Sequence, residues 1–240
     1  MWMICKKEWQ QFFNSLTGYL AIIVFLLING LWLFVFPETS LLNFGYASLG
    51  GFFSFAPFVL LFLIPTITMR SLADEYKVGT FELLKTLPLQ ITDIVMGKFL
   101  GALCIVVAAL LPTIVYAISI QQLSIVGGID MGATIGSYIG LICLAAVYTA
   151  VGICSSSYTN NTVVAFIAGA FVCFLLLYGF EAISKLPIFK AGADYYIEML
   201  GINFHYKSIS RGVIDIKDII YFTTLSILFL QLTKYNISKR

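Results

Sequence analysis

The chain has 240 residues, of which 60% are hydrophobic and only 11% are charged. Soluble domains carry about 25% charged residues, so this composition excludes them and indicates one domain, residues 1–240, of a polytopic membrane protein. The net charge of +2 is too small, and the basic residues too dispersed, to suggest a nucleic-acid partner.

Residues 2–15 combine tryptophan and phenylalanine with lysine, a pattern typical of a helix lying at the membrane interface. The alternative is a frayed terminus with incidental aromatic residues. The apolar run 16–36 follows, and it is longer than a signal-peptide core and lacks a small-x-small cleavage site. We therefore expect an uncleaved first span.

The second and third spans are predicted at 52–69 and 99–120, and a charged segment separates them. Within this segment Gly79 breaks the chain, Thr80 is a suitable helix N-cap, and Glu82 falls in the first turn, where the helix dipole favours an anion. Pro88 forbids continuation of the helix. The pattern predicts a short helix at the membrane surface, carried by two spans. The alternative is a solvated loop whose helix only rests on lipid headgroups.

The spacing of these residues resembles the cytoplasmic loop of ABC-2 type transporter permeases. In that family the loop contains a coupling helix that docks on a separate ATP-binding subunit. The resemblance implies coupling roles for Glu75, Gly79, Thr80, Phe81, Glu82, Leu84 and Pro88. The sequence contains no G-x-x-x-x-G-K-[ST] phosphate loop, so we expect this chain to hold no cofactor, with ATP and magnesium on the partner.

The fourth and fifth spans are predicted at 133–154 and 162–180, with small residues at four-residue intervals. Such spacing lets helices approach closely in lipid. The residues expected at helix contacts are Gly132, Gly136, Gly140 and Gly169. Packing within one subunit and a seam between two subunits are both compatible with this pattern.

The segment 181–218 has too many charges to cross a membrane and too many apolar residues for a free loop, so we expect short amphipathic or partly re-entrant helices on the outer side. Its single histidine, His205, has no second histidine to share a metal, and we expect a polar surface residue. The five cysteines show no ligand spacing and predict neither a metal site nor disulfides. A short sixth span is predicted at 219–233.

Most of the basic residues fall in segments that are cytoplasmic if the N-terminus is inside. The sequence therefore predicts an all-α protein with six spans and both termini in the cytoplasm, in a bacterial inner membrane. The spans carry almost no ionisable residue, which argues against a proton-coupled or sodium-coupled carrier.

The predicted function is the permease subunit of an ATP-driven exporter, working with an ATP-binding subunit and a second permease chain, either a copy or a homologue. The alternative is a membrane scaffold that docks a cytoplasmic partner without transport. The segment from His205 to Phe222 also resembles the gliding-motility permease subunit. That resemblance implies a role in gliding and a further membrane-anchored subunit.

Overall fold

The computed structural model describes residues 1–36, 48–82, 90–124, 128–186, 194–213 and 215–239, and these contain helices and no strand. In chain order the elements are α1 (Trp2–Phe13), α2 (Leu16–Phe34), α4 (Gly50–Val78), α6 (Ile91–Leu110), the 3-10 turn η1 (Leu111–Thr113), α7 (Ile114–Leu123), α8 (Met131–Tyr158), α9 (Thr162–Phe174), the π turn η2 (Leu175–Gly179), α10 (Phe180–Ser184), α11 (Asp194–Glu198), α12 (Ile202–Ser210) and α13 (Ile216–Lys239).

Six helical segments of the described chain are long and apolar enough to cross a membrane, which confirms the predicted fold class. Two of them contain short irregular turns without interruption of the helix, η1 at Pro112 and η2 at Leu175–Gly179. The spanning segments are Leu16–Phe34, Gly50–Val78, Ile91–Leu123, Met131–Tyr158, Thr162–Ser184 and Ile216–Lys239.

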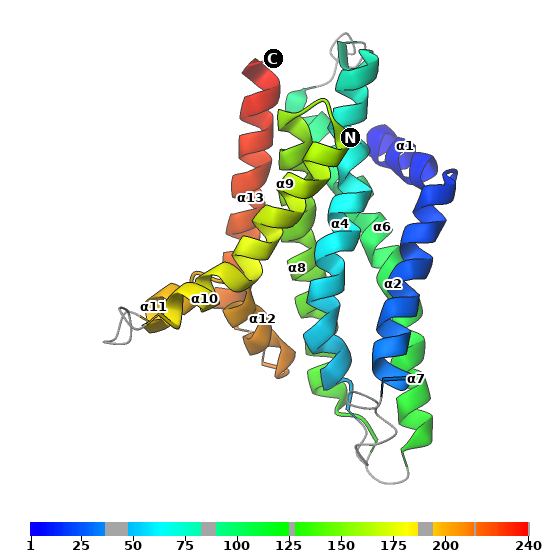
Figure 1. Ribbon diagram of the computed structural model, residues 1–240, viewed down its shortest axis with the longest axis vertical. Coiled ribbons are helices and arrows are strands. Elements are labelled where there is room, and N and C mark those ends of the chain that lie inside the picture. The colour runs from blue at the N-terminus through cyan, green and yellow to red at the C-terminus, as the bar shows by residue number, and fades with distance from the viewer. Residues whose placement is uncertain (37–47, 83–89, 125–127, 187–193, 214, 240) are drawn as a thin grey trace.

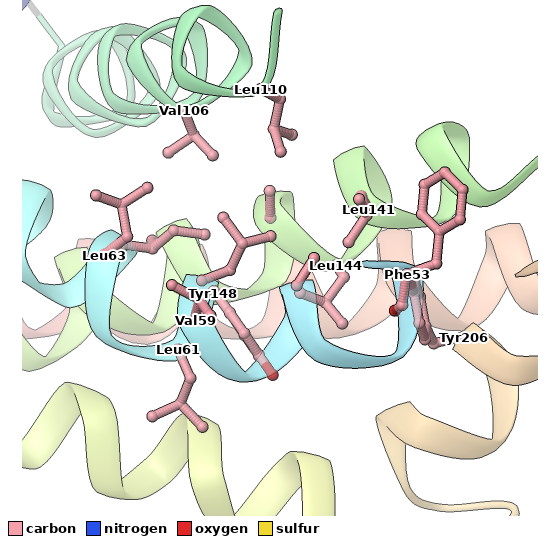
Figure 2. Packing of buried hydrophobic residues seen from close by; sticks show 14 of the residues in the cluster. Phe53, Val59, Leu61, Leu63, Val106, Leu110, Leu141, Leu144, Tyr148 and Tyr206 are labelled. Atoms are coloured by element: carbon pink, nitrogen blue, oxygen red, sulfur yellow. The ribbon is translucent and has the colours of Figure 1, made fainter. Parts of the chain in front are cut away.

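The core of the bundle lies along α4 and α8, which are the most buried of the spanning helices. Figure 2 shows apolar side chains of α4, α6 and α8 converging there, among them Val59, Val106 and Leu144. Gly152 of α8 brings the two central backbones together, because a Cβ at this position would overlap Thr68 of α4. The close approach of α4 and α8 fixes the frame on which the other helices pack.

The helices around this pair keep large apolar side chains on their outer faces, as expected for surfaces in contact with lipid. Examples are Leu27 of α2, Ile167 of α9 and Ile227 of α13, each more than half exposed. Figure 1 shows α1 lying across the bundle at one end, close to both chain termini, while α10, α11 and α12 lie toward the other end. An even number of spans places the termini at the same end.

In two places the helix extends beyond the predicted span. The predicted second span ends at residue 69, but α4 continues as helix to Val78, so part of the expected connector is a helical extension. The predicted sixth span covers 219–233, whereas α13 runs from Ile216 to Lys239. In both cases the helix continues through charged residues, which end an apolar run without ending a helix.

The residues after the fifth span form the expected short helices α11 and α12, whereas α10 is the last part of that span. The prediction for His205 is wrong. Its side chain is only 3% exposed. The ring Nδ1 lies 2.6 Å from a carboxylate oxygen of Asp218, Nε2 lies 2.9 Å from the Met199 carbonyl, and the ring stacks on Tyr221. His205 therefore joins α12 to the start of α13 inside the protein.

Candidate functional site

The charged end of α4 projects beyond the apolar part of the helix. Residues 70–78 contain neither proline nor glycine, so the backbone continues as helix until Gly79. Gly79 has a φ of 77°, the left-handed conformation that only glycine adopts without strain, and its N–H donates to the Tyr76 carbonyl. The chain break predicted at Gly79 is therefore present, and it ends the helical extension of α4 that residues 70–78 form.

A cluster of four charged side chains holds this extension to α6 and α1. Lys98 of α6 is 1% exposed, and its Nζ lies 2.8 Å from a carboxylate oxygen of Glu8 and 3.0 Å from one of Glu75. The same Nζ donates to the Ser71 carbonyl at 2.6 Å, and Lys7 pairs with Glu75 at 3.0 Å. Two cations and two anions balance, and Lys98 and the two acids are largely buried whereas Lys7 is half exposed. We name Lys7, Glu8, Glu75 and Lys98 the charge cluster.

Small residues let α1 lie directly on the backbone of α6. A Cβ at Gly97 would lie 2.8 Å from the Cβ of Ile4, and one at Gly101 would lie 2.9 Å from the Cβ of Glu8. Real Cβ atoms do not approach so closely, so any larger residue here would push α1 away. The charge cluster and these two glycines together make α1 part of the same rigid unit as α4 and α6.

A hydroxyl from α8 enters the hydrogen-bond ladder of α4 where the extension begins. The Oγ of Ser156 accepts from the N–H groups of Leu72 and Ala73, both at 3.0 Å, and donates to the Met69 carbonyl at 3.1 Å. In an uninterrupted helix the Ala73 N–H would donate to Met69 alone. Side chains inserted in this way are a known cause of helix bending. Ser156 therefore marks the joint between the membrane part of α4 and its extension.

The helix predicted after Gly79 is present. Thr80, which was expected to be the N-cap, is itself the first helical residue. Phe81 is 4% exposed, contacts the ring of Tyr76, and belongs to a buried cluster with apolar residues of α6, α8 and α13. Glu82 is exposed on the surface. Leu84 and Pro88 lie outside the described residues. Phe81 thus anchors the start of the helix from inside, while Glu82 faces outward.

The coupling roles inferred for these residues stay predictions, but the structure gives Glu75 a contact that the sequence did not suggest. Its carboxylate pairs inside the chain, in the charge cluster, rather than on the surface. Sequence reasoning missed Lys98 and Ser156. One feature of the sequence could have identified Lys98, which directly follows Gly97 at the start of an apolar run. Another could have identified Ser156, which lies four residues after Gly152 on the same helix face.

The predicted packing glycines divide between two contacts inside the chain. A Cβ at Gly136 would lie 3.0 Å from the Ile209 carbonyl, and one at Gly140 would lie 3.3 Å from the Ile209 side chain, so both face α12. Gly132 lies beside Gly212, next to the same contact, and Gly169 of α9 faces Pro65 and Gly152.

Within the described part of the chain, no group of three His, Cys, Asp or Glu residues could hold a metal ion.

The described residues form an α-helical bundle with six segments that can span a membrane. The bundle has a charged, partly buried end from which a helix projects. These features define a multi-pass membrane protein. The family model described as ABC-2 family transporter protein matches residues 2–210, and the chain belongs to this family. It is the permease subunit of an ABC transporter, a membrane subunit without its own ATPase site, and such permeases generally pair with an ATP-binding subunit. No curated protein matches the chain.

Proposed function

We propose that this chain forms half of the membrane pore of an exporter and that a separate ATP-binding subunit drives it through residues 70–98. The supporting observation is the arrangement at the end of α4. A helical extension ends at the left-handed Gly79 and a new helix starts at Thr80. Among its described residues, Phe81 is buried and the neighbouring acid Glu82 is exposed.

The helix that begins at Thr80 is connected to the membrane-spanning helices through buried packing. Phe81 belongs to a buried apolar cluster with residues of four helices, including Leu72 of α4, Val95 of α6 and Ile153 of α8. Movement of Phe81 therefore displaces the ends of these helices together, because close-packed interiors transmit strain. The charge cluster carries α1 along with α4 and α6.

The proposal includes a second permease chain, because ABC ATPases work in pairs and one chain offers one such loop. It also places the chain in the inner membrane of a bacterium, with the charge cluster and both termini on the cytoplasmic side. This orientation is supported by the lysines within α1 and near the C-terminal ends of α4 and α13, which follow the preference of basic residues for the cytoplasm.

The finer assignment to gliding motility, with an auxiliary membrane-anchored subunit, rests on the similarity of residues 205–222 alone. Deletion of the gene in its native host should then abolish gliding without affecting growth. A deletion strain that glides normally would remove this assignment and leave the transport function in place.

Affinity purification of the tagged full-length chain from native membranes tests the main proposal. We expect an ATP-binding subunit to copurify and its ATP hydrolysis in nanodiscs to change when the permease is present. A chain that copurifies with cytoplasmic proteins but with no ATPase would favour the membrane scaffold instead.

A further inference from the structure

A pocket of about 290 Å³ lies where α1 and the start of α2 meet α4 and α6 (Figure 1). Its volume is close to the lower limit of small-molecule sites, about 300 Å³, so it can enclose a lipid headgroup but not a whole lipid. The exposed Gln11 and Thr17 and the half-buried Phe12 line it from α1 and α2. The pocket is therefore accessible where the amphipathic α1 meets the first span.

One face of α4 runs from the apolar part of the bundle into this pocket. Phe58 and Phe62 are 37% and 46% exposed. Thr66, Arg70 and Asp74 continue the face and line the pocket, and Arg70 is the most open of the three. Residues at four-residue intervals lie in one row along a helix. The row thus passes from two aromatic rings through a hydroxyl to a cation and then to an acid, which is the order of polarity along a membrane lipid.

Arg70 and Asp74 carry the charges of the lining that form no ion pair within the described residues. The third charged residue of the lining, Glu8, pairs with Lys98 at 2.8 Å. The Nη1 of Arg70 donates to the Oγ1 of Thr17 at 3.3 Å, which directs the guanidinium toward the start of α2. A guanidinium has five N–H donors, so most of them are left for a ligand.

One cation and one acid on the same wall match a zwitterion better than an ion of one sign. An anion alone would pair with Arg70 but would meet the carboxylate of Asp74 about 6 Å further along the helix axis. A phosphate joined to an amine by a short linker satisfies both residues. A primary ammonium also has three N–H donors for a carboxylate, as the lysine head has, whereas a quaternary ammonium has none. Phosphoethanolamine therefore fits the pocket better than phosphocholine.

We propose that this pocket holds the headgroup of phosphatidylethanolamine from the leaflet beside α1. The phosphate accepts from Arg70, the ammonium donates to Asp74, and the acyl chains lie along Phe58 and Phe62. The bound lipid thereby joins the corner between α1 and α2 to α4. This inference goes beyond the proposed function, because the binding requires neither the ATP-binding subunit nor transport.

Native mass spectrometry of the full-length chain in detergent tests the proposal. The chain is titrated with an equimolar mixture of phosphatidylethanolamine, phosphatidylcholine and phosphatidylglycerol that carry identical acyl chains. Because the lipids compete in one sample, their ratio on the protein does not depend on the fraction of chain that is folded. Asp74→Asn and Arg70→Gln each remove one charge of the pocket. The matched controls, Asp93→Asn and Lys77→Gln, remove charges of α6 and α4 that do not line it.

We expect the wild type to retain phosphatidylethanolamine over phosphatidylcholine by about tenfold, as hydrogen bonds between charged groups imply. Asp74→Asn should abolish this preference, Arg70→Gln should weaken both lipids, and the controls should change retention by less than about twofold. Equal retention of the two lipids by the wild type, a preference for phosphatidylglycerol, or an unchanged preference in Asp74→Asn would overturn the proposal. So would displacement of the lipid by free phosphoethanolamine, which has no chains to contact Phe58 and Phe62.

Discussion

Lys98 is the residue on which the charge cluster depends. It is almost fully buried, and it contacts an acid of α1, an acid of α4 and a carbonyl of α4. Such a side chain is tolerated because its charge is paired with two carboxylates and its ammonium donates to Glu8 and to the Ser71 carbonyl. Its position explains why α1, an amphipathic helix with exposed Trp2 and Met3, is held to the bundle rather than to lipid alone.

Lys98→Met should destabilise the protein strongly. It leaves Glu8 and Glu75 with Lys7 alone, and removing one member of a buried ion pair costs about 3–5 kcal/mol. Thermal unfolding in detergent measures this loss. Lys77→Met, an exposed lysine of α4, is the control and should change stability by about 0.5 kcal/mol or less. If Lys98→Met together with Glu75→Gln were no more stable than Lys98→Met alone, the two groups would not be coupled.

The sequence could not have supplied these contacts. The partners of Lys98 lie 90 residues away at Glu8 and 27 residues away at Ser71, and nothing local marks them as neighbours. The side chain of Glu75 has the right residue type for a surface contact, yet folding directs it inward. Residue types and local spacing identify Gly79 as a break, because that property belongs to glycine itself. Long-range pairing depends on tertiary structure.

At the scale of elements, spans with clean apolar boundaries could be predicted well. The expected spans 16–36 and 162–180 agree with Leu16–Phe34 and Thr162–Ser184 within a few residues. The ends of α4 and α13 could not, since the helix continues there beyond the apolar run and through charged residues. A hydropathy pattern reports where lipid ends, whereas backbone hydrogen bonding decides where the helix ends.

The joint in α4 predicts a change of orientation when its inserted hydroxyl is removed. In Ser156→Ala the contact of α8 with the N–H groups of Leu72 and Ala73 is lost, so the extension of α4 should shift relative to α8 and α13. Spin labels at Lys77 and Ser238, both exposed, measure the distance between α4 and α13 by pulsed EPR in a background without native cysteines. Ser155→Ala is the control, because Ser155 donates only to Val151. A distance distribution unchanged in Ser156→Ala would contradict the joint.

The packing of α1 on α6 predicts a steric effect at Gly97. Cys5 of α1 and Cys104 of α6 are neighbours in this packing, and burial, together with the nearby Cys104, raises the pKa of Cys5. Copper phenanthroline should therefore join these two thiols in the wild type and protect both from a maleimide–polyethylene glycol gel-shift reagent. Gly97→Leu should abolish the protection by displacing α1, while Gly51→Leu, which meets no neighbouring atom, should not. Persistent crosslinking in Gly97→Leu would refute the close contact.

For the whole molecule, the proposed orientation places Lys77 inside the cell and Lys207 outside. A cysteine at Lys207 should then react with an impermeant maleimide in intact cells, and one at Lys77 should react only after permeabilisation. Both side chains are exposed in the structure, so burial does not explain a difference between them. The opposite labelling pattern would place the charge cluster outside the cell and remove the coupling role from residues 70–98.

The central claim is that the helix beginning at Thr80 transmits force from an ATP-binding subunit, and the charge of Glu82 tests it most directly. Glu82 is exposed and lies in the first turn of its helix, where its effect on the helix dipole is about 0.3–1 kcal/mol. Loss of a charge paired across an interface costs more, about 2–5 kcal/mol. We expect Glu82→Lys to leave membrane insertion and abundance near normal and to weaken retention of the copurified ATPase in detergent pull-downs by more than tenfold. Asp93→Lys, nearer the membrane, should have a smaller effect. Full retention of the ATPase by Glu82→Lys, with hydrolysis still coupled to the permease, would contradict the account.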